Sequence, residues 1–332
     1  MHHSRTSPTP SGANLWLAIG DETGPFVNPQ SANLHGAGLI LARPAALAAA
    51  LNENLNGRSI RQRMDAPIEG LENWLRAQGA ENEDELHRHH VLEAWPYLIE
   101  RCIKGEYTLD ATPSDPVLYH LLAAFRWLAG HPEIISLGIH GTAKEVMTDF
   151  WKGSDSMAVL GAIYGRSLAL IKPFLGPAPR IRVLPGRRSE ATNSPSILRA
   201  GQEVPKSSYG TGRQSSSKTG GNRTLLETME SEFWKTLAVM SDQGGANATA
   251  STRQITFAGY MDKTEAVAAL KREDELAARL VGQEEHRLNS LADLACSLMA
   301  ASGDTAARDL RLQFPTPIGP NVRFFSVKEV LS

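Results

Sequence analysis

Apolar and polar positions along the first forty residues predict two buried strands. Residues 15–20, Leu-Trp-Leu-Ala-Ile-Gly, form an uncharged apolar run, which is typical of a strand buried on both faces. A second apolar run covers residues 34–41 and contains Gly36 and Gly38. A loop between the two runs can join them as an antiparallel pair. Residues 1–13 are polar and predict a disordered tail.

Helical spacing dominates the next ninety residues, and strand-like runs return after them. We expect a helical insertion at about 45–130, where apolar residues recur every three or four positions and Pro44 and Pro116 stand at helix starts. Expected strands then cover 134–139, 181–184 and 255–261, and expected helices cover 164–174, 225–240, 262–287 and 288–301. This order predicts a mixed α/β sheet with flanking helices, in a single domain over residues 14–332.

Residues 186–223 have a composition of their own. They are rich in Ser, Gly, Thr and Pro and poor in core-forming side chains, so we expect a disordered loop. Seven basic residues oppose two acidic ones there, a local charge of +5. Such a segment can hold a phosphate backbone without reading base sequence, although a solubilising loop explains the same composition. The residues that we assign to nucleic-acid contact are Arg187, Arg188, Arg213, Lys218 and Arg223.

The overall composition limits which classes of protein this chain fits. The chain is 42% hydrophobic with a formal net charge of -2, so contact with nucleic acid would need a local basic patch. No apolar run approaches the ~20 residues that span a bilayer, and the first residues lack the apolar stretch of a secretory signal. We therefore expect a cytoplasmic protein without a membrane partner. Cys102 and Cys296 lie in apolar helical patterns, which predicts buried free thiols.

Acidic side chains mark both ends of the predicted domain. Asp21 and Glu22 follow the first strand directly and repel each other. Magnesium or manganese can compensate this charge, because both ions prefer carboxylate oxygens; an exposed turn that keeps both groups in water is the alternative. Asp293 lies within an apolar helical run, where an unpaired carboxylate would be costly. A salt bridge, hydrogen bonds or a metal ion can compensate it.

A third polar cluster contains Glu85, His87 and His90. The two histidines are one helical turn apart and can share a face. No third zinc ligand accompanies them at a known spacing, so a solvated polar face at a helix start is the favoured interpretation of the histidines.

Three of these segments, taken in order, resemble an uncharacterised family with a ribonuclease H-like fold. Residues 17–24, Leu-Ala-Ile-Gly-Asp-Glu-Thr-Gly, are similar to its first strand, which ends in Ile-Asp-Glu-Ser-Gly. Residues 288–295, Leu-Asn-Ser-Leu-Ala-Asp-Leu-Ala, are similar to its closing helix, Leu-Gln-Leu-Ala-Asp-Leu. Between them, residues 85–87, Glu-Leu-His, match an element that enters a helix.

The chain also departs from that pattern. Gly20 replaces an aliphatic residue, Thr23 replaces Ser, and residues 289–290 replace the Gln neighbourhood of the closing helix. The family often carries an acidic residue after the strand that precedes its middle linker, whereas here the first carboxylate after residues 181–184 belongs to Glu190.

The resemblance implies a ribonuclease H-like nuclease that hydrolyses the phosphodiester bonds of DNA or RNA. Asp21, Glu85 and Asp293 would converge on one or two Mg²⁺ or Mn²⁺ ions, with Glu22 as a further ligand or a supporting group. Two such ions about 4 Å apart activate water and stabilise the leaving oxygen. His87 would shuttle a proton or orient the phosphate, or else only hydrogen-bond a carboxylate. A protein partner is a further expectation. The alternatives are an inactive binding or regulatory module and a structural subunit of an assembly.

Overall fold

The computed structural model describes most of the strands and helices that the sequence predicts. The described residues are 14–23, 34–65, 73, 76–77, 116–142, 144–146, 156–176, 179–186, 213–214, 223–242, 255–258, 264–303 and 321–331. The tail expected at residues 1–13 lies outside them, as do most of the loop expected at 186–223 and much of the insertion expected at 45–130.

Six strands form one mixed sheet in the order β10-β5-β2-β1-β6-β9. Their bounds are β1 Leu15–Thr23, β2 Leu34–Ala42, β5 Ile134–Thr142, β6 Arg180–Pro185, β9 Ile255–Phe257 and β10 Val322–Ser326. Strand β2 runs antiparallel to both of its neighbours, whereas the pairs β1–β6, β6–β9 and β5–β10 are parallel. The expected antiparallel pair of the first two strands is confirmed, and β1 lies in the interior of the sheet.

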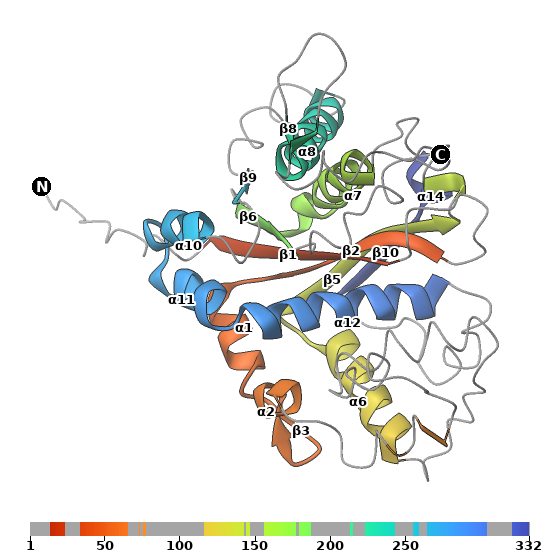
Figure 1. The fold of residues 1–332 in the computed structure, drawn as a ribbon, viewed down its shortest axis with the longest axis vertical. Helices are drawn as coiled ribbons and strands as arrows, with labels where there is room; N and C mark the ends of the chain where they lie inside the picture. Colours follow the sequence, from red (N-terminus) through yellow and green to blue (C-terminus); the bar gives the residue numbers. More distant parts are fainter. Residues whose placement is uncertain are drawn as a thin grey trace, which may run out of the picture.

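Helices cover both faces of this sheet (Figure 1). One face carries α1 Pro44–Ala50, α2 Ile60–Asp65, α6 Pro116–Gly130, α11 Glu275–Gln283 and α12 Glu285–Gly303. The other face carries α7 Ser156–Ile171, α8 Leu225–Asp242 and α14 Val327–Leu331. The short helix α10 Thr264–Lys271 precedes α11, and a single 3-10 turn, Lys172–Phe174, follows α7. The expected mixed α/β sheet with flanking helices is therefore confirmed.

The alternation of side chains along β1 divides the core into two halves. Leu15, Leu17 and Ile19 are fully buried in the half that contains α12, whereas Ala18 lies in the half that contains α7. Because successive strand residues point to opposite faces, a strand buried in this way reads as a continuous apolar run. The uncharged segment at the start of the chain was predicted as a strand for this reason.

The region from residue 45 to residue 130 is less uniformly helical than its pattern predicts. Helices α1 and α6 begin at Pro44 and Pro116, as expected. Between α1 and α2, however, strands β3 Asn54–Leu55 and β4 Arg58–Ser59 form a hairpin. Its turn residues Asn56 and Gly57 have φ angles of 51° and 84°, and an Asn-Gly pair is the preferred sequence for such a turn.

Two further elements differ from the expectation near the C-terminus. The charged stretch 262–287 is divided among α10, α11 and the start of α12. Asp274 accepts a hydrogen bond from the backbone N–H of Ala277 and begins α11 as its N-cap. Strand β10 was not predicted at all. It extends the sheet beyond β5 at the edge opposite β9.

Helices α7 and α8 approach each other closely through two glycines of α7. A Cβ atom at Gly161 would overlap the carbonyl oxygen of Met229, and one at Gly165 would lie 2.8 Å from the carbonyl oxygen of Phe233. The absence of side chains at these positions lets the two backbones come into contact. This contact brings the buried ring of Phe233 into the core beneath α7.

We predict that Gly161→Ala lowers the free energy of unfolding by about 1–3 kcal/mol, because the new methyl group has no space against the α8 backbone. Gly130→Ala is the matched control, since no atom lies within 4 Å of a Cβ there. That control should change stability by less than about 1 kcal/mol. Urea unfolding followed by circular dichroism measures both changes, and equal effects would contradict the close packing of α7 on α8.

Candidate functional site

The carboxyl end of β1 presents its two acidic residues on opposite faces of the sheet. Asp21 follows Ile19 by two positions, so the alternation of the strand directs it to the α12 face, and Glu22 to the α7 face. Both residues are partly exposed. The Asp21 carboxylate accepts a hydrogen bond of 2.8 Å from the backbone N–H of Glu22. Asp21 is therefore the acidic residue of this strand that faces the final long helix.

Cys296 connects α12 with the same end of the sheet. Gly38 of β2 is the register partner of Asp21, and its backbone N–H donates to Cys296 Sγ at 3.2 Å. Asp293 precedes Cys296 by three positions and Asn289 precedes Asp293 by four, so all three lie along one side of the helix. Helix α12 thus carries a carboxylate and an amide along the side that meets the end of β1.

The charge environment of Cys296 shows that the acidic residues gather there. Burial raises the pKa of its thiol well above the usual value, and the negative charges of Asp21 and Asp293 raise it further, with a smaller contribution from Glu22. The hydrogen bond from Gly38 acts in the opposite direction. Within the part of the chain that the structure describes, each charge that acts on this thiol is negative. The thiol stays protonated beside a cluster of carboxylates.

Gly186, which directly follows β6, also borders this site beside β1 and α12. The backbone N–H of Gly186 donates to the carbonyl oxygen of Gly20 at 2.8 Å. A Cβ atom at Gly186 would lie 3.2 Å from Asn289 Oδ1 and 3.9 Å from Asp21 Oδ1. The two oxygens therefore face a common space that a side chain at position 186 would fill. Asn289 was not among the predicted site residues, and its spacing of four positions before Asp293 is the signal that could have found it.

Asp293 is less enclosed than its sequence context implies. Its neighbours Ala292 and Leu294 are fully buried, whereas Asp293 itself is partly exposed. A partly exposed carboxylate keeps contact with water, so Asp293 needs less compensation than a fully buried one would. The flanking serines bond to their own helix instead: Ser290 Oγ donates to the His286 carbonyl and Ser297 Oγ to the Asp293 carbonyl.

The structure brings together some of the predicted site residues. Asp21 and Asp293 lie on the same side of the sheet near Cys296, with Glu22 on the adjacent position of β1. Glu85 and His87 lie outside the described residues, as do Arg187, Arg188 and Lys218. Arg213 and Arg223 belong to a short hairpin of β7 Arg213–Gln214 and β8 Arg223–Thr224, within the segment expected to be a disordered loop.

Metal-ligand geometry is incomplete in the described part of the chain. The described residues contain no group of three or more His, Cys, Asp or Glu side chains placed to hold a metal ion. The predicted metal ligand Glu85 lies outside these residues, so the full set Asp21, Glu85 and Asp293 stays a prediction. Cys296 is a buried free cysteine, as expected, and Cys102 lies outside the described residues.

Comparisons with known proteins gave no match: no family model, no curated protein and no solved structure is significantly similar to this chain. Of the helices described, none is both long enough and apolar enough to cross a membrane.

We predict that Cys296→Ala reduces the loss of stability at alkaline pH. The folded state raises the pKa of this thiol above its usual value of about 9. Its contribution to stability is therefore complete below the unfolded pKa and is lost as the pH rises above it, by up to about 1.4 kcal/mol per pH unit.

Urea unfolding between about pH 8 and 10 measures this difference. Both proteins keep Cys102, so other titrating groups cancel in the comparison. Parallel losses of stability in the two proteins would show that the fold does not raise the pKa of this thiol, contrary to its burial beside Asp21 and Asp293.

Proposed function

We propose that this protein is a divalent-metal-dependent nuclease with a ribonuclease H-like fold. The observation that carries the proposal is the convergence of Asp21 from the first strand and Asp293 from the last long helix beside Cys296. The two residues lie at opposite ends of the chain, and the sequence resemblance implies this convergence for catalytic carboxylates. A sheet with the Asp21 strand in its interior supports the same assignment.

The donor set suits a magnesium or manganese ion. Carboxylate and amide oxygens are the ligands that these hard cations prefer, and Asp21 Oδ1 and Asn289 Oδ1 border one space beside Gly186. Asp21, Asp293 and Glu22 also make the local potential negative, and like charges held this close favour a bound cation. Asp21 and Asp293 would hold the ion, with Glu85 as the further ligand that the resemblance implies.

A bound divalent ion supplies Lewis-acid polarisation of a phosphoryl oxygen and lowers the pKa of a coordinated water. The chain's own residues would position it. The backbone N–H of Glu22 orients the Asp21 carboxylate. The hydrogen bond from the Gly186 N–H to the Gly20 carbonyl oxygen holds the end of β6 beside β1 at the site. The absence of a side chain at Gly186 keeps the space beside these oxygens open.

The principal departure from the resembling family has a packing explanation. Gly20 stands where that family carries an aliphatic residue. Here the ring of Tyr164, which is buried on α7, occupies that space, because a Cβ at Gly20 would lie 2.7 Å from Tyr164 Cε1 and 3.0 Å from Leu39 Cδ2. An aromatic ring supplied by the facing helix occupies the space of the strand side chain.

One specific observation favours an inactive nucleic-acid-binding module instead. The described residues lack a third metal-holding side chain beside Asp21 and Asp293, so a chain in which Glu85 lies elsewhere would retain the fold without catalysis. In both proposals, the basic residues Arg213 and Arg223 of the β7–β8 hairpin contact phosphate.

Cleavage assays distinguish a nuclease from an inactive nucleic-acid-binding module. We predict that the protein cleaves single- or double-stranded DNA or RNA in the presence of Mn²⁺ or Mg²⁺, and that Asp21→Asn and Asp293→Asn each reduce the rate by about 100-fold or more through loss of a metal ligand. Glu133→Gln removes an exposed carboxylate outside the site and is the matched control. Nucleic-acid binding without cleavage in every metal would support the module.

Thermal stability provides a second readout that does not require turnover. We predict that Mn²⁺ at about 100 times its dissociation constant stabilises the natural protein by about 2.7 kcal/mol, and that Asp21→Asn abolishes this increase. Without metal, Asp21→Asn should melt at the same temperature or higher, because it relieves repulsion from Asp293. An equal response to metal in both proteins would place the bound ion elsewhere.

A further inference from the structure

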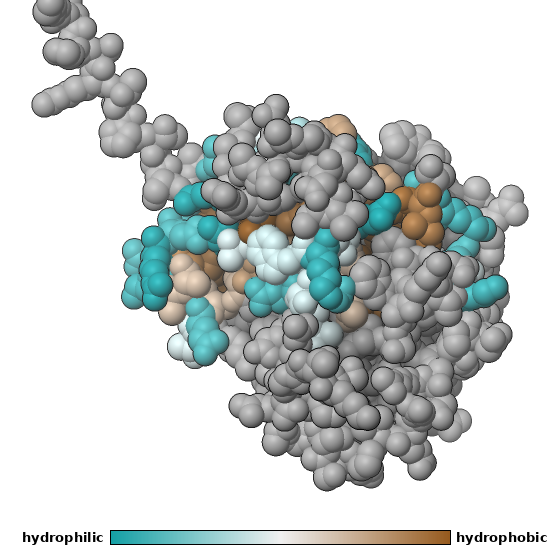
Figure 2. Space-filling view, turned by 90° about the horizontal axis from the view of Figure 1, so that it is seen from above, coloured by the Kyte–Doolittle hydropathy of each residue, from teal (hydrophilic) through white to brown (hydrophobic). Residues whose placement is uncertain are grey.

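Two adjoining hollows run along α11, at the end of the molecule away from β10. One, of about 580 Å³, lies between α10 and α11, and the other, of about 310 Å³, lies between α11 and the segment that carries α1 and α2. Leu276, Arg279 and Gln283 line both hollows, so the two adjoin along this row of α11 side chains, and we call them together the groove. In Figure 2 the end of the molecule where α10 lies shows hydrophilic side chains beside weakly hydrophobic ones.

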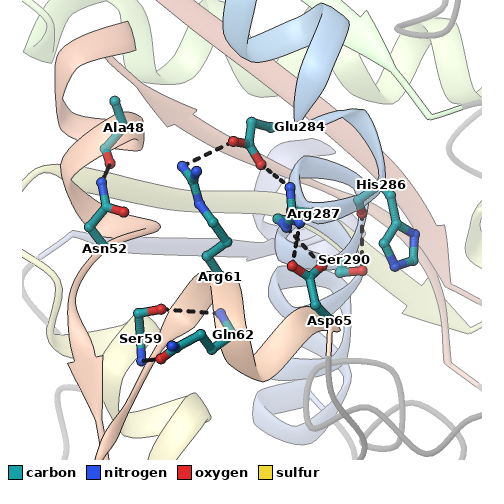
Figure 3. A network of polar contacts seen from close by, with 10 residues as sticks. All are labelled: Ala48, Asn52, Ser59, Arg61, Gln62, Asp65, Glu284, His286, Arg287 and Ser290. Atoms are coloured by element: carbon teal, nitrogen blue, oxygen red, sulfur yellow. Dashed lines mark hydrogen bonds and ion pairs between the residues drawn. The ribbon is translucent and has the colours of Figure 1, made fainter.

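The smaller hollow has an excess of positive charge. Arg61, Arg279 and Glu284 are its charged lining residues, and the Glu284 carboxylate is already engaged on both oxygens. Oε1 pairs with Arg61 Nη2 at 3.0 Å, and Oε2 pairs with Arg287 Nη1. Asp65 accepts from Arg287 Nε at 2.9 Å. Figure 3 shows Arg61 rising from α2 toward Glu284, with Asn52 on one side and Arg287 on the other.

Donors in this groove lack acceptors. The Nε atom of Arg61 is buried and forms no hydrogen bond, and such a donor costs about 1–3 kcal/mol when it is left unsatisfied. Arg279 is exposed, and none of the residues that the structure describes pairs with it. Lys271, at the edge of the larger hollow, is likewise exposed and without a partner among those residues. Arg279 and Lys271 are complementary to an anion, and Arg61, whose side chain is 38% exposed, lines the same hollow as Arg279.

We propose that this groove binds a phosphate-bearing ligand, with a phosphate group in the smaller hollow between Arg61 and Arg279. Glu284 acts as a positioning residue that holds the Arg61 guanidinium at the wall of the hollow. Planar guanidinium groups suit phosphate because their N–H donors match its oxygens. Lys271 continues the positive charge into the larger hollow, where a second phosphate along a chain would lie.

The source of the phosphate is either a nucleic-acid strand or a free nucleotide, and the two probes are a single-stranded oligonucleotide and inorganic phosphate. The proposal does not depend on nuclease activity, since none of its residues belongs to the carboxylate site. Binding is titrated without a divalent ion, whereas cleavage requires one, so each can be lost without the other. Loss of activity and loss of groove binding are therefore distinguishable.

The full chain is titrated with a labelled oligonucleotide by fluorescence anisotropy and with inorganic phosphate by calorimetry. We expect Arg279→Gln to weaken binding by about tenfold, which corresponds to about 1.4 kcal/mol for a charge-assisted hydrogen bond. For the oligonucleotide, the slope of log K against log salt should fall by about 0.7. Arg272→Gln, an exposed arginine in the adjacent turn that does not line the groove, is the matched control and should leave binding unchanged.

Arg61→Gln tests the buried donor, with circular dichroism to verify folding because this change also removes an ion pair. If Arg61→Gln does not fold, Arg279→Gln still tests the proposal, because the Arg279 side chain is exposed. Stronger binding of the oligonucleotide than of phosphate identifies a strand as the source, and binding of phosphate alone identifies a small ligand. Equal losses in Arg279→Gln and Arg272→Gln, or no binding of either probe, would overturn the proposal.

Discussion

The architecture of the candidate site depends on how closely α12 approaches the sheet. Side chains are absent from β2 and β5 where the helix crosses them: a Cβ at Gly38 would lie 2.9 Å from Cys296 Sγ and 3.3 Å from the Cys296 backbone. One at Gly138 would lie 2.6 Å from Met299 Sδ. Since interiors are close-packed, such a contact sets both the height and the rotation of the helix. The polar side chains one and two turns before Cys296 consequently reach the end of β1.

This close approach concentrates negative charge next to an apolar interior. The protonated side chain of Cys296 is small and neutral, and it fills the space between α12 and β2. A charged or larger side chain at this position would add charge or volume there. Helix α12 contributes Leu291 and Leu298 to the core, so burial of apolar surface stabilises the helix against the repulsion of the carboxylates. Neighbouring residues of α12 therefore supply both apolar core side chains and a carboxylate of the candidate site.

Strands and helices with a strong apolar pattern of their own could be predicted from the sequence. The strand at 15–20 is a continuous apolar run and the helix at 288–301 is mostly apolar, and the acidic residues that end or interrupt them, Asp21 and Asp293, were predicted for that reason. Strand β10 was missed because it is a short edge strand whose residues are mostly half-buried. Asn289 was missed because its one signal, the spacing of four positions before Asp293, does not by itself distinguish a site residue from a surface amide until the fold brings it beside Gly186. The carboxylates themselves were associated through resemblance rather than periodicity.

The contact between Gly38 and Cys296 joins positions 258 residues apart along the chain. A ribosome adds about 5–20 residues per second, so during translation the helical partner emerges roughly 13 to 50 seconds after the strand. A nascent polypeptide cannot assemble the carboxylate pair in that interval. Asp21 and Asp293 therefore meet only after the whole of α12 has left the ribosome.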